Sequence, residues 1–497
     1  MSYHLLSYSL LFLPIALVLY QATPQSFRWM VILGLDYIFF YMLSGKLLIY
    51  LLGATLITYL FGMWISHADT HFKGSNKEKT KRKKWILALG VVLNLSMLVL
   101  LKYVNVYGGF DWAAPIGISY YTLQSISYMT DIHRGNIKPN KNLAKVALYM
   151  SFFPQIMEGP IAKFSETADD LYEGESLSFY NVKSGYQRIL YGLVKKMLIA
   201  DRLAPLVSKI FGNYENYAGS VILIAAICFT IQLYMEFSGC MDIVCGSSEM
   251  FGVILPDNFR QPFFAKNASE FWRRWHITLG RWLKDYIFYS VSLAKPVKSI
   301  SKWSKKHLGK NVSKFVGPTI ALFCVWLSNG IWHGPHQTYI FYGMFYFVII
   351  FIENIMEAPM NKIISKTGYS KDKGIFGVIS SVRILFIIVI GEMFFRAATI
   401  SSGLSMFTKI FTNFNLRAVI ESNYGIDILD AVIAFVFALG VLVVDILHEK
   451  KICVRHSIDT MKLPIRWGIW YAVILCLVIF GAYGIGYTVI DMIYAAY

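Results

Sequence analysis

Residues 317–334 read GPTIALFCVWLSNGIWHG, a run that contains no Asp, Glu, Lys or Arg. A transmembrane helix needs about 20 predominantly apolar residues, so we interpret 316–332 as a membrane span. Next to the end of the run lies His333, a titratable side chain that is costly to place in hydrocarbon. Two alternatives remain for His333. It is a hydrogen-bonded core histidine, or it is a functional group that faces water inside the protein.

The rest of the chain fits a membrane protein with many spans. Of its 497 residues 56% are hydrophobic and 15% are charged, and the mean hydropathy is +0.50; soluble domains carry about 25% charged residues. The predicted spans are 5–21, 29–44, 47–66, 85–102, 220–235, 316–332, 338–352, 380–395, 430–446 and 468–488. Since no basic residue precedes 5–21, we predict a retained span there and not a cleaved signal. We therefore predict an all-α polytopic membrane protein that forms a single membrane domain over 1–497.

Three weaker spans contain Gly, Pro and polar residues, namely 115–130, 143–157 and 186–200. We expect them to be broken or re-entrant. Irregular backbone is tolerated at membrane depth only inside protein or beside a watery cavity. We therefore expect the functional site to be formed by the middle of the chain.

The net charge of +17 would indicate nucleic-acid binding in a soluble protein. Here the basic residues fall between apolar runs, which favours cytoplasmic loops and no nucleic-acid partner. The stretch HFKGSNKEKTKRKK (71–84) is predicted to be cytoplasmic, with the N-terminus outside. A second basic stretch, LAKPVKSISKWSKKHLGKNVSK (293–314), is predicted as an amphipathic helix on an anionic leaflet. The alternatives are a solvated cytoplasmic loop and a docking surface for an acidic partner such as an acyl carrier protein.

Common catalytic signatures do not appear in this sequence. There is no CxxC pair among the six cysteines, so we expect neither a disulfide framework nor a zinc site. The nucleotide loop GxxxxGK[ST], the zinc helix HExxH and the serine elbow GxSxG are also missing. An enzyme of this kind would need an activated substrate, for example a thioester.

Polar residues inside or beside the spans form three clusters, which are candidate functional sites. IQLYMEFSGCMDIVCG (231–246) contains Glu236 and Asp242, six residues apart and so on different faces of a helix; we expect Gly239 to break that helix. Residues 267–290 alternate charged and aromatic side chains and are predicted to form an interfacial helix that lines a polar mouth. The third cluster holds Asn329 and His333, where flanking glycines would let another group approach closely.

Five blocks, in this order along the chain, resemble the membrane-bound O-acyltransferase (MBOAT) family. They are PIGISYYTLQSISYMTDIHRG (115–135), SFFPQIMEGPIAKF (151–164), QLYMEFSGCMDIVCGSSEMFGVILPDNFRQPF (232–263), FWRRWHITLGRWLKDYIF (271–288) and LSNGIWHG (327–334). They are most similar to the bacterial branch of alginate O-acetyltransferases and D-alanyl transfer proteins. The resemblance covers about 110–345 and leaves the C-terminal helices and tail, 374–497, outside the motifs. It implies a ring of tilted transmembrane and re-entrant helices around a central tunnel, with His333 near the narrowest point.

The resemblance also implies the chemistry. His333 would be the catalytic base, His276 the second required polar position, and Asn329 a group that orients the imidazole or the substrate. Further substrate-binding or orienting candidates are Trp332, Glu236, Asp242, Trp275 and Asp285. We expect no tightly bound cofactor and no metal. Acetyl-CoA or an acyl carrier protein thioester would be the donor.

On the outer side, the resemblance implies a partner transferase of the esterase-like SGNH type. The chain ends YGIGYTVIDMIYAAY, and Tyr494 in this tail is a candidate acyl relay to that partner. The alternative is an ordinary interfacial tyrosine, since Ala495 and Ala496 stand where relatives carry bulkier residues.

The function we expect is O-acylation, with an acetyl group, of an exported or cell-wall polysaccharide by a multi-pass protein of the bacterial cell membrane. An alternative in the same family is D-alanyl transfer to teichoic acid. An alternative from another class is a transporter, because broken helices and intramembrane charges also occur there.

Overall fold

The computed structural model describes residues 3, 5, 7–71, 74–104, 108, 113–367 and 374–483, and over these residues every regular element is a helix. The predicted all-α class is confirmed. The chain divides into two compact units, which we describe separately. Among the described residues, unit 1 contains those up to Leu193 together with Gly239–Asp257, and unit 2 contains Val194–Ser238 and those from Asn258 to Tyr483. The single membrane domain stays a prediction.

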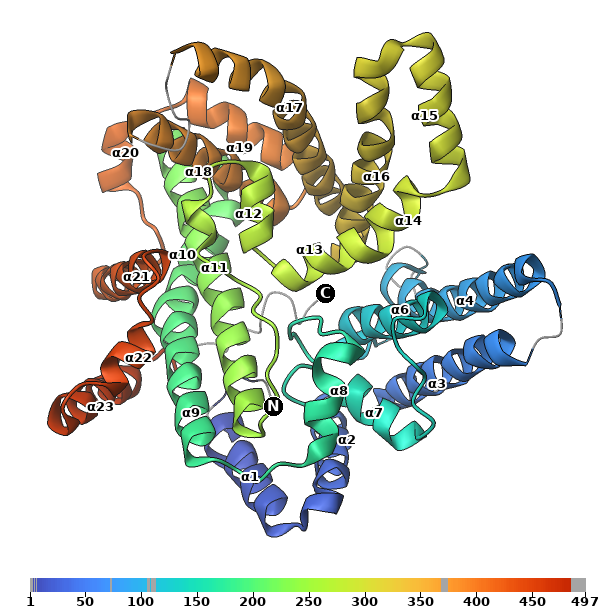
Figure 1. Ribbon diagram of the computed structural model, residues 1–497. Helices are drawn as coiled ribbons and strands as arrows, with labels where there is room; N and C mark the ends of the chain where they lie inside the picture. The colour runs from blue at the N-terminus through green and yellow to red at the C-terminus, as the bar shows by residue number, and fades with distance from the viewer. Residues whose placement is uncertain are drawn as a thin grey trace. The chain divides into compact units, whose positions relative to one another are not determined.

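Unit 1 is built from the N-terminal helices and the last part of α11 (Figure 1). Its helices are α1 (Leu13–Ala22), α2 (Arg28–Ser44), α3 (Leu48–Thr70), α4 (Asn76–Val99), α6 (Ile118–Arg134), α7 (Leu143–Ser151), α8 (Phe164–Glu173) and α9 (Phe179–Leu193). Wide π-helical turns precede α1 (η1, Tyr8–Phe12) and follow α4 (η4, Leu100–Val104). Helices α3, α4 and α6 pack against one another.

Unit 2 holds the first part of α11 (Gly219–Met250) and the remaining described helices. They are η5 (Val194–Ala200), α10 (Asp201–Gly212), α12 (Ala268–Arg274), α13 (Ile277–Leu283), η8 (Lys284–Phe288), α14 (Tyr289–Ser292), α15 (Lys295–His307), α16 (Gly309–His333), α17 (Gln337–Thr367), α18 (Gly374–Arg396), α19 (Ile400–Thr412), α20 (Leu416–Glu421), α21 (Ile428–Glu449), α22 (Val454–Asp459) and α23 (Leu463–Phe480). The elements η5 and η8 are π-helical.

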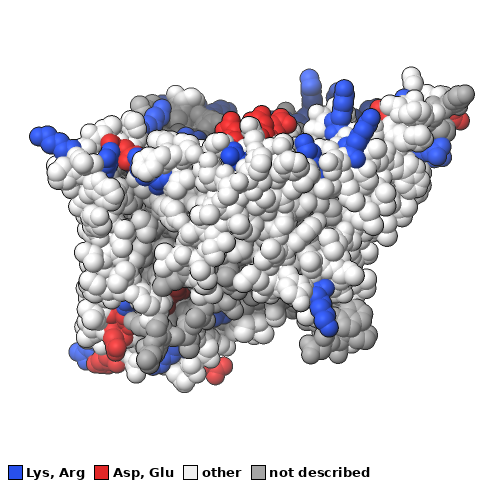
Figure 2. Space-filling model, turned by 90° about the horizontal axis from the view of Figure 1, so that it is seen from below, with Lys and Arg blue, Asp and Glu red and all other residues white. Residues whose placement is uncertain are grey.

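The described chain contains eight stretches that are long and apolar enough to cross a membrane. Gln25–Thr70 covers the two predicted spans 29–44 and 47–66, and each of the other seven stretches overlaps one strong predicted span from 85–102 onward. The predicted span 5–21 appears as the shorter apolar segment Tyr8–Ala22. The last span differs from its predicted bounds, because Pro464 opens α23 early and the helix ends at Phe480 before Gly481. Figure 2 shows that, on the face in view, Lys, Arg, Asp and Glu side chains gather in patches and that other side chains cover most of the surface. The chain is a multi-pass membrane protein.

Gly239 does not break α11, so that expectation was wrong. The helix runs without interruption from Gly219 to Met250. A Cβ at Gly192 on α9 would lie 2.4 Å from the Gly239 carbonyl oxygen, and Gly185 and Gly246 approach each other in the same way. These glycines let α9 and α11 pack backbone to backbone, as small residues commonly do in membrane helices.

The predicted weak span 143–157 is broken, as expected. Helix α7 ends at Ser151, where the buried carboxylate of Asp36 on α2 accepts two hydrogen bonds. Asp36 Oδ1 accepts from the Phe153 N–H at 2.7 Å, and Oδ2 accepts from the Ser151 hydroxyl at 3.0 Å. The irregular segment that follows is buried in unit 1. Asp36 thus accepts a hydrogen bond from a backbone N–H group that has lost its partner in the helix.

Gly117 allows this irregular segment to approach α6. Its φ is +77°, and a Cβ there would lie 1.9 Å from the Ile156 carbonyl oxygen. We expect Gly117→Ala to lower the melting temperature of the detergent-solubilised protein strongly. Gly135→Ala is the matched control, because Gly135 has nearly the same φ of +79° and nothing within 4 Å of its Cβ position. The Gly135→Ala substitution should lower the free energy of unfolding by only about 1 kcal/mol, which is the cost of placing a non-glycine residue in the left-handed region. Equal losses in the two variants would show that the contact with Ile156 is unimportant.

In unit 2, α15 and α16 form a helical hairpin, and α16 packs along α17 (Figure 1). The predicted basic helix is present as α15, where Val297 and Ser304 are buried and Trp303 is exposed among the lysines. Its predicted contact with an anionic leaflet stays a prediction. Gly330 and Gly343 permit the close contact of α16 with α17, since a Cβ at Gly343 would lie 2.4 Å from the Trp326 carbonyl oxygen.

Candidate active site

The block FWRRWHITLGRWLKDYIF forms a turn between two short helices in unit 2, not the single interfacial helix that we predicted. Helix α12 ends at Arg274, and α13 begins at Ile277. Between them, His276 has φ +46° and ψ +52°, in the left-handed region that non-glycine residues seldom occupy. This conformation turns the chain so that both helices face one cavity.

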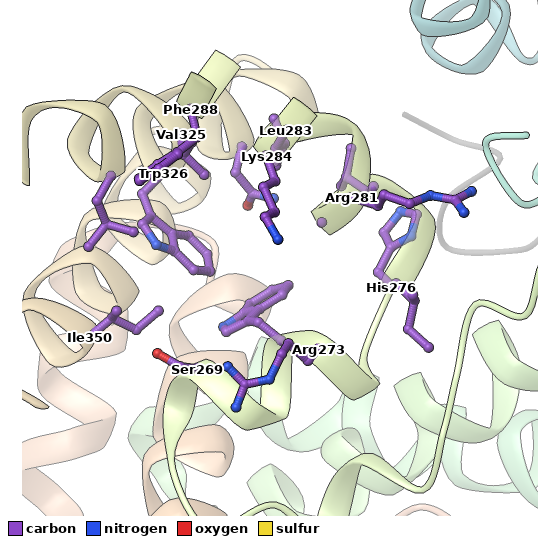
Figure 3. A pocket seen from close by; sticks show the side chains of 16 residues that line it. Ser269, Arg273, His276, Arg281, Leu283, Lys284, Phe288, Val325, Trp326 and Ile350 are labelled. Carbon is purple, nitrogen blue, oxygen red and sulfur yellow. The ribbon is translucent and has the colours of Figure 1, made fainter. Parts of the chain in front are cut away.

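The cavity has a volume of about 510 Å³, which lies within the range of small-molecule sites. Its walls come from α12, α13, η8, α16 and α17. The lining residues are Ser269, Trp272, Arg273, His276, Ile277, Leu279, Gly280, Arg281, Leu283, Lys284, Phe288, Leu322, Val325, Trp326, Asn329 and Ile350. Figure 3 shows Lys284 reaching into the cavity, with His276 and Arg281 together on one side of it.

The cavity combines apolar walls with positive charge. Arg273, Arg281 and Lys284 line it, and none of the described lining residues is Asp or Glu. Trp272 and Trp326 form an aromatic wall, with ring centroids 4.8 Å apart in an edge-to-face arrangement. Such a site suits a ligand that carries both an apolar portion and negative charge.

His276 is almost fully buried at the cavity wall. It lies outside the eight membrane-crossing stretches. Burial lowers the pKa of His276 to about 3, because the charged imidazolium would lose its hydration. Its imidazole is therefore neutral over the whole physiological pH range.

His333 is the last residue of α16, and Gly334 with φ +148° ends the helix immediately after it. Aromatic rings surround the imidazole, with centroids 5.2 Å away for Phe395 and 6.1 Å for Tyr339. Among the described residues that line the cavity, His333 is not included, whereas Asn329, one helical turn before it, is. His336, three residues later, is exposed just before α17 begins.

The Trp332 ring lies close to both His276 and His333. Its ring centroid lies 5.0 Å from that of His333 and 5.8 Å from that of His276. The structure therefore brings the candidate residues His276, Asn329, Trp332 and His333 into one neighbourhood. Trp275 is buried behind this group, in edge contact with Phe259, and does not line the cavity that the structure describes.

The two acidic residues predicted on α11 occupy ion pairs in different units. Glu236 accepts from the buried Lys196 ammonium at 3.0 Å, and Lys196 also lies 2.8 Å from Asp201. In unit 1, Asp242 pairs with Arg188 at 3.1 Å. Neither carboxylate lines the described cavity. Their positions favour roles in holding helices together.

Asp285 lies in the wide turn η8, beside the cavity residue Lys284, and is itself absent from the described lining. Tyr494 lies outside the described residues, so its relay role stays a prediction. All six cysteines are free thiols. Among the residues that the structure describes, no cluster of three or more His, Cys, Asp or Glu side chains is placed to hold a metal ion.

Sequence reasoning missed Lys196 and Asn258. Lys196 lies in the weak span 186–200, where the pair Lys195 and Lys196 between apolar residues was a signal. Asn258 accepts hydrogen bonds around His276, and its position in the loop after α11 gave no periodic signal.

The model of the family described as "MBOAT, membrane-bound O-acyltransferase family" matches residues 37–395, well over half of the chain. This range includes all of the predicted site residues except Tyr494.

Three relatives illustrate the range of similar proteins. "Probable alginate O-acetylase AlgI" of Pseudomonas syringae is 30% identical over 418 residues, which cover 81% of this chain and 73% of the relative. "Peptidoglycan O-acetyltransferase" of Helicobacter pylori is 27% identical over 372 residues, or 67% of this chain and 65% of the relative. "Teichoic acid D-alanyltransferase" of Bacillus subtilis is 27% identical over 253 residues, or 49% of this chain and 59% of the relative.

Proposed function

The chain belongs to the membrane-bound O-acyltransferase family and is a bacterial membrane acyltransferase, and from this premise we propose that it transfers an acetyl group from a thioester donor to an exported or cell-wall polysaccharide. Two relatives named above act, by their names, on alginate and on peptidoglycan. The similarity to the alginate O-acetylase covers 81% of the chain, against 49% for the D-alanyltransferase. This difference favours O-acetyl transfer over D-alanyl transfer. Membership of an acyltransferase family argues against the transporter alternative.

The observation that carries the donor side of this proposal is the cavity beside His276. Arg and Lys side chains are common phosphate binders, and three of them line a cavity whose described lining contains no carboxylate. Coenzyme A and a carrier protein's phosphopantetheine both combine phosphate with a thioester arm. Arg281 and Lys284 would bind the phosphate, and Trp272 and Trp326 would pack against the arm. The basic hairpin α15–α16 would suit an acidic carrier protein as the alternative donor.

The reaction needs one base. His333 takes the proton of the acceptor hydroxyl while that oxygen attacks the thioester carbonyl carbon. The new C–O bond forms, the C–S bond breaks, and the imidazolium returns the proton to the departing thiolate. Asn329 lines the donor cavity on the same helix face as His333, one turn earlier, so it would orient the thioester toward the base. Trp332 would separate the two histidines.

On the outer side, we assign delivery of the acetyl group to an SGNH-type partner transferase, with Tyr494 as the relay. This part rests on the family resemblance of the C-terminal tail.

Donor binding tests the proposal directly. We expect the double variant Arg281→Gln, Lys284→Gln to bind acetyl-CoA at least tenfold more weakly, because charge-assisted hydrogen bonds to phosphate contribute about 1.5–3 kcal/mol each. Isothermal titration calorimetry of the full chain in lipid nanodiscs would measure it. Lys298→Gln, on α15 outside the cavity, is the matched control.

Acetyl-phosphopantetheine should compete with acetyl-CoA for the same site if the arm and its phosphate are what the cavity recognises. Unchanged acetyl-CoA affinity in the double variant would contradict the assignment of this cavity to the donor. Mass spectrometry of surface polysaccharide, compared between cells with and without the chain, should show loss of acetyl groups. Loss of D-alanine instead would establish the alternative.

A further inference from the structure

The loop after α11 meets the turn between α12 and α13 at a hydrogen-bond cluster centred on one side-chain oxygen. Asn258 Oδ1 lies 2.9 Å from the Thr278 hydroxyl, 3.1 Å from the Thr278 backbone N–H and 3.1 Å from His276 Nδ1. All three residues are at most 2% exposed. The cluster is therefore shielded from water.

The chemistry of this cluster identifies the atoms. A backbone N–H can only donate, so the Asn258 atom that faces Thr278 must be the oxygen and not the amide nitrogen. The same oxygen faces His276 Nδ1. An oxygen of a carboxamide can only accept, so Nδ1 must carry the proton. In a neutral imidazole the other nitrogen, Nε2, then carries the lone pair.

The backbone around the cluster is fixed by further hydrogen bonds. The Asn258 carbonyl accepts from the Ile277 N–H at 3.0 Å, and the Arg260 N–H donates to the Arg274 carbonyl at 2.9 Å. These bonds tie residues 258–260 to the turn that contains His276. The left-handed backbone of His276 is held in place by this pairing, and such strain occurs mostly where the surroundings enforce it.

The imidazole plane is also fixed. The Phe237 ring meets it edge to face with centroids 4.9 Å apart, and Trp332 lies against it at 5.8 Å. A ring held by Asn258 at Nδ1 and by aromatic rings around it is held in one orientation as well as in one tautomer.

We propose that Asn258 is a positioning residue that holds His276 as the Nδ1–H tautomer, so that Nε2 is a hydrogen-bond acceptor for an N–H or O–H group of the donor bound in the cavity. This rests on the proposed function only for the identity of the ligand. Asn258 acts through His276, because Asn258 itself is not among the described residues that line the cavity.

The charged groups around His276 favour a neutral acceptor. Arg273 on α12, Arg281 on α13 and Lys284 on η8 line the same cavity. Glu236, next to Phe237 on α11, is engaged by Lys196, and His333 lies beyond Trp332 on α16. An imidazolium would add a further positive charge to this basic site, whereas a neutral ring with a lone pair complements a ligand N–H or O–H.

Nuclear magnetic resonance can read the tautomer without any turnover. The full chain would carry ¹⁵N-labelled histidine imidazoles in lipid bilayers, and His276→Asn would identify the His276 signals by their loss, since Asn tolerates the left-handed conformation. At neutral pH we expect a protonated Nδ1 and an unprotonated Nε2. A protonated Nε2 in the wild-type chain would overturn the proposal.

Variants separate positioning from simple structural support. Asn258→Ala should release the tautomer and weaken acetyl-CoA binding about tenfold, because a buried ligand group then loses its acceptor. Thr278→Val removes another hydrogen bond to the same oxygen and should leave the His276 signals and the affinity within twofold of wild type. Equal losses in both variants would mean that Asn258 only stabilises the loop.

Asn258→Asp keeps the acceptor and adds a charge, which covers the case in which Asn258→Ala does not fold. We expect the Nδ1–H bond to persist and His276 to become protonated at a pH at least one unit higher than in wild type, since a carboxylate stabilises imidazolium. An unchanged titration of His276 would also overturn the proposal. If wild type shows the expected tautomer but does not bind acetyl-CoA, the donor assignment fails and the positioning role stands.

Discussion

Replacing His333 with alanine should abolish acyl transfer. General-base catalysis by a positioned imidazole contributes about 10²–10⁴-fold to a rate, and the run 317–334 contains no Asp, Glu, Lys or Arg and no second His. The measurement is transfer of radiolabelled acetyl from acetyl-CoA in inverted membrane vesicles that contain the full chain. We expect the affinity for acetyl-CoA to be preserved, because His333 is not among the described residues that line the donor cavity.

His336→Ala is the matched control for this experiment. It removes an imidazole three residues away that is exposed just before α17, and it should leave the rate within twofold of wild type. Retention of more than a tenth of the activity by the His333 variant would exclude His333 as the base. His276, which lines the cavity, would then be the remaining histidine in reach of the thioester.

Lys196→Met should destabilise unit 2 more than any surface substitution. The Lys196 ammonium lies 2.8 Å from Asp201 and 3.0 Å from Glu236, with 1% of its own side chain exposed. Removing it leaves two carboxylates buried near each other without their counter-ion. Breaking a buried ion pair in this way costs about 3–5 kcal/mol. Thermal denaturation in detergent, followed by size-exclusion chromatography, would measure the loss.

A neutral triple variant tests the electrostatic origin of that loss. Combining Lys196→Met with Glu236→Gln and Asp201→Asn removes every charge of the cluster, and we expect it to recover most of the lost stability. If the triple variant is as unstable as Lys196→Met alone, packing of the lysine stem would be the cause. The instability of Lys196→Met would then not be evidence for an electrostatic contribution of the ion pairs.

The sequence predicted most of the fold because membrane spans depend on a local property. A run of apolar residues such as 431–444 must form a helix in lipid wherever it lies, since its backbone has no other hydrogen-bond partners there. The break after Ser151 was predicted from the proline and polar residues within 143–157. Its partner Asp36 was not, because the carboxylate comes from a helix more than a hundred residues earlier and no local pattern marks the pairing.

The candidate site was predicted in part for the same reason. His276 and His333 stand out as polar residues in apolar surroundings, and the structure places both against Trp332. Glu236 stands out equally, yet its partner Lys196 engages it away from the described cavity. Composition shows which side chains are unusual, and only tertiary contacts show whether an ion pair or a ligand explains them.

The wide turn η8 makes the cavity wall sensitive to chain length. A π-helical turn accommodates one more residue than an α-helical turn does, and Lys284 and Phe288, at the two ends of η8, both line the cavity. Excision of a single residue between them would convert the wide turn into an α-helical one, with Lys284 and Phe288 three positions apart instead of four. A one-residue deletion here would therefore change the placement of Phe288 relative to Lys284 without removing any side chain that lines the described cavity.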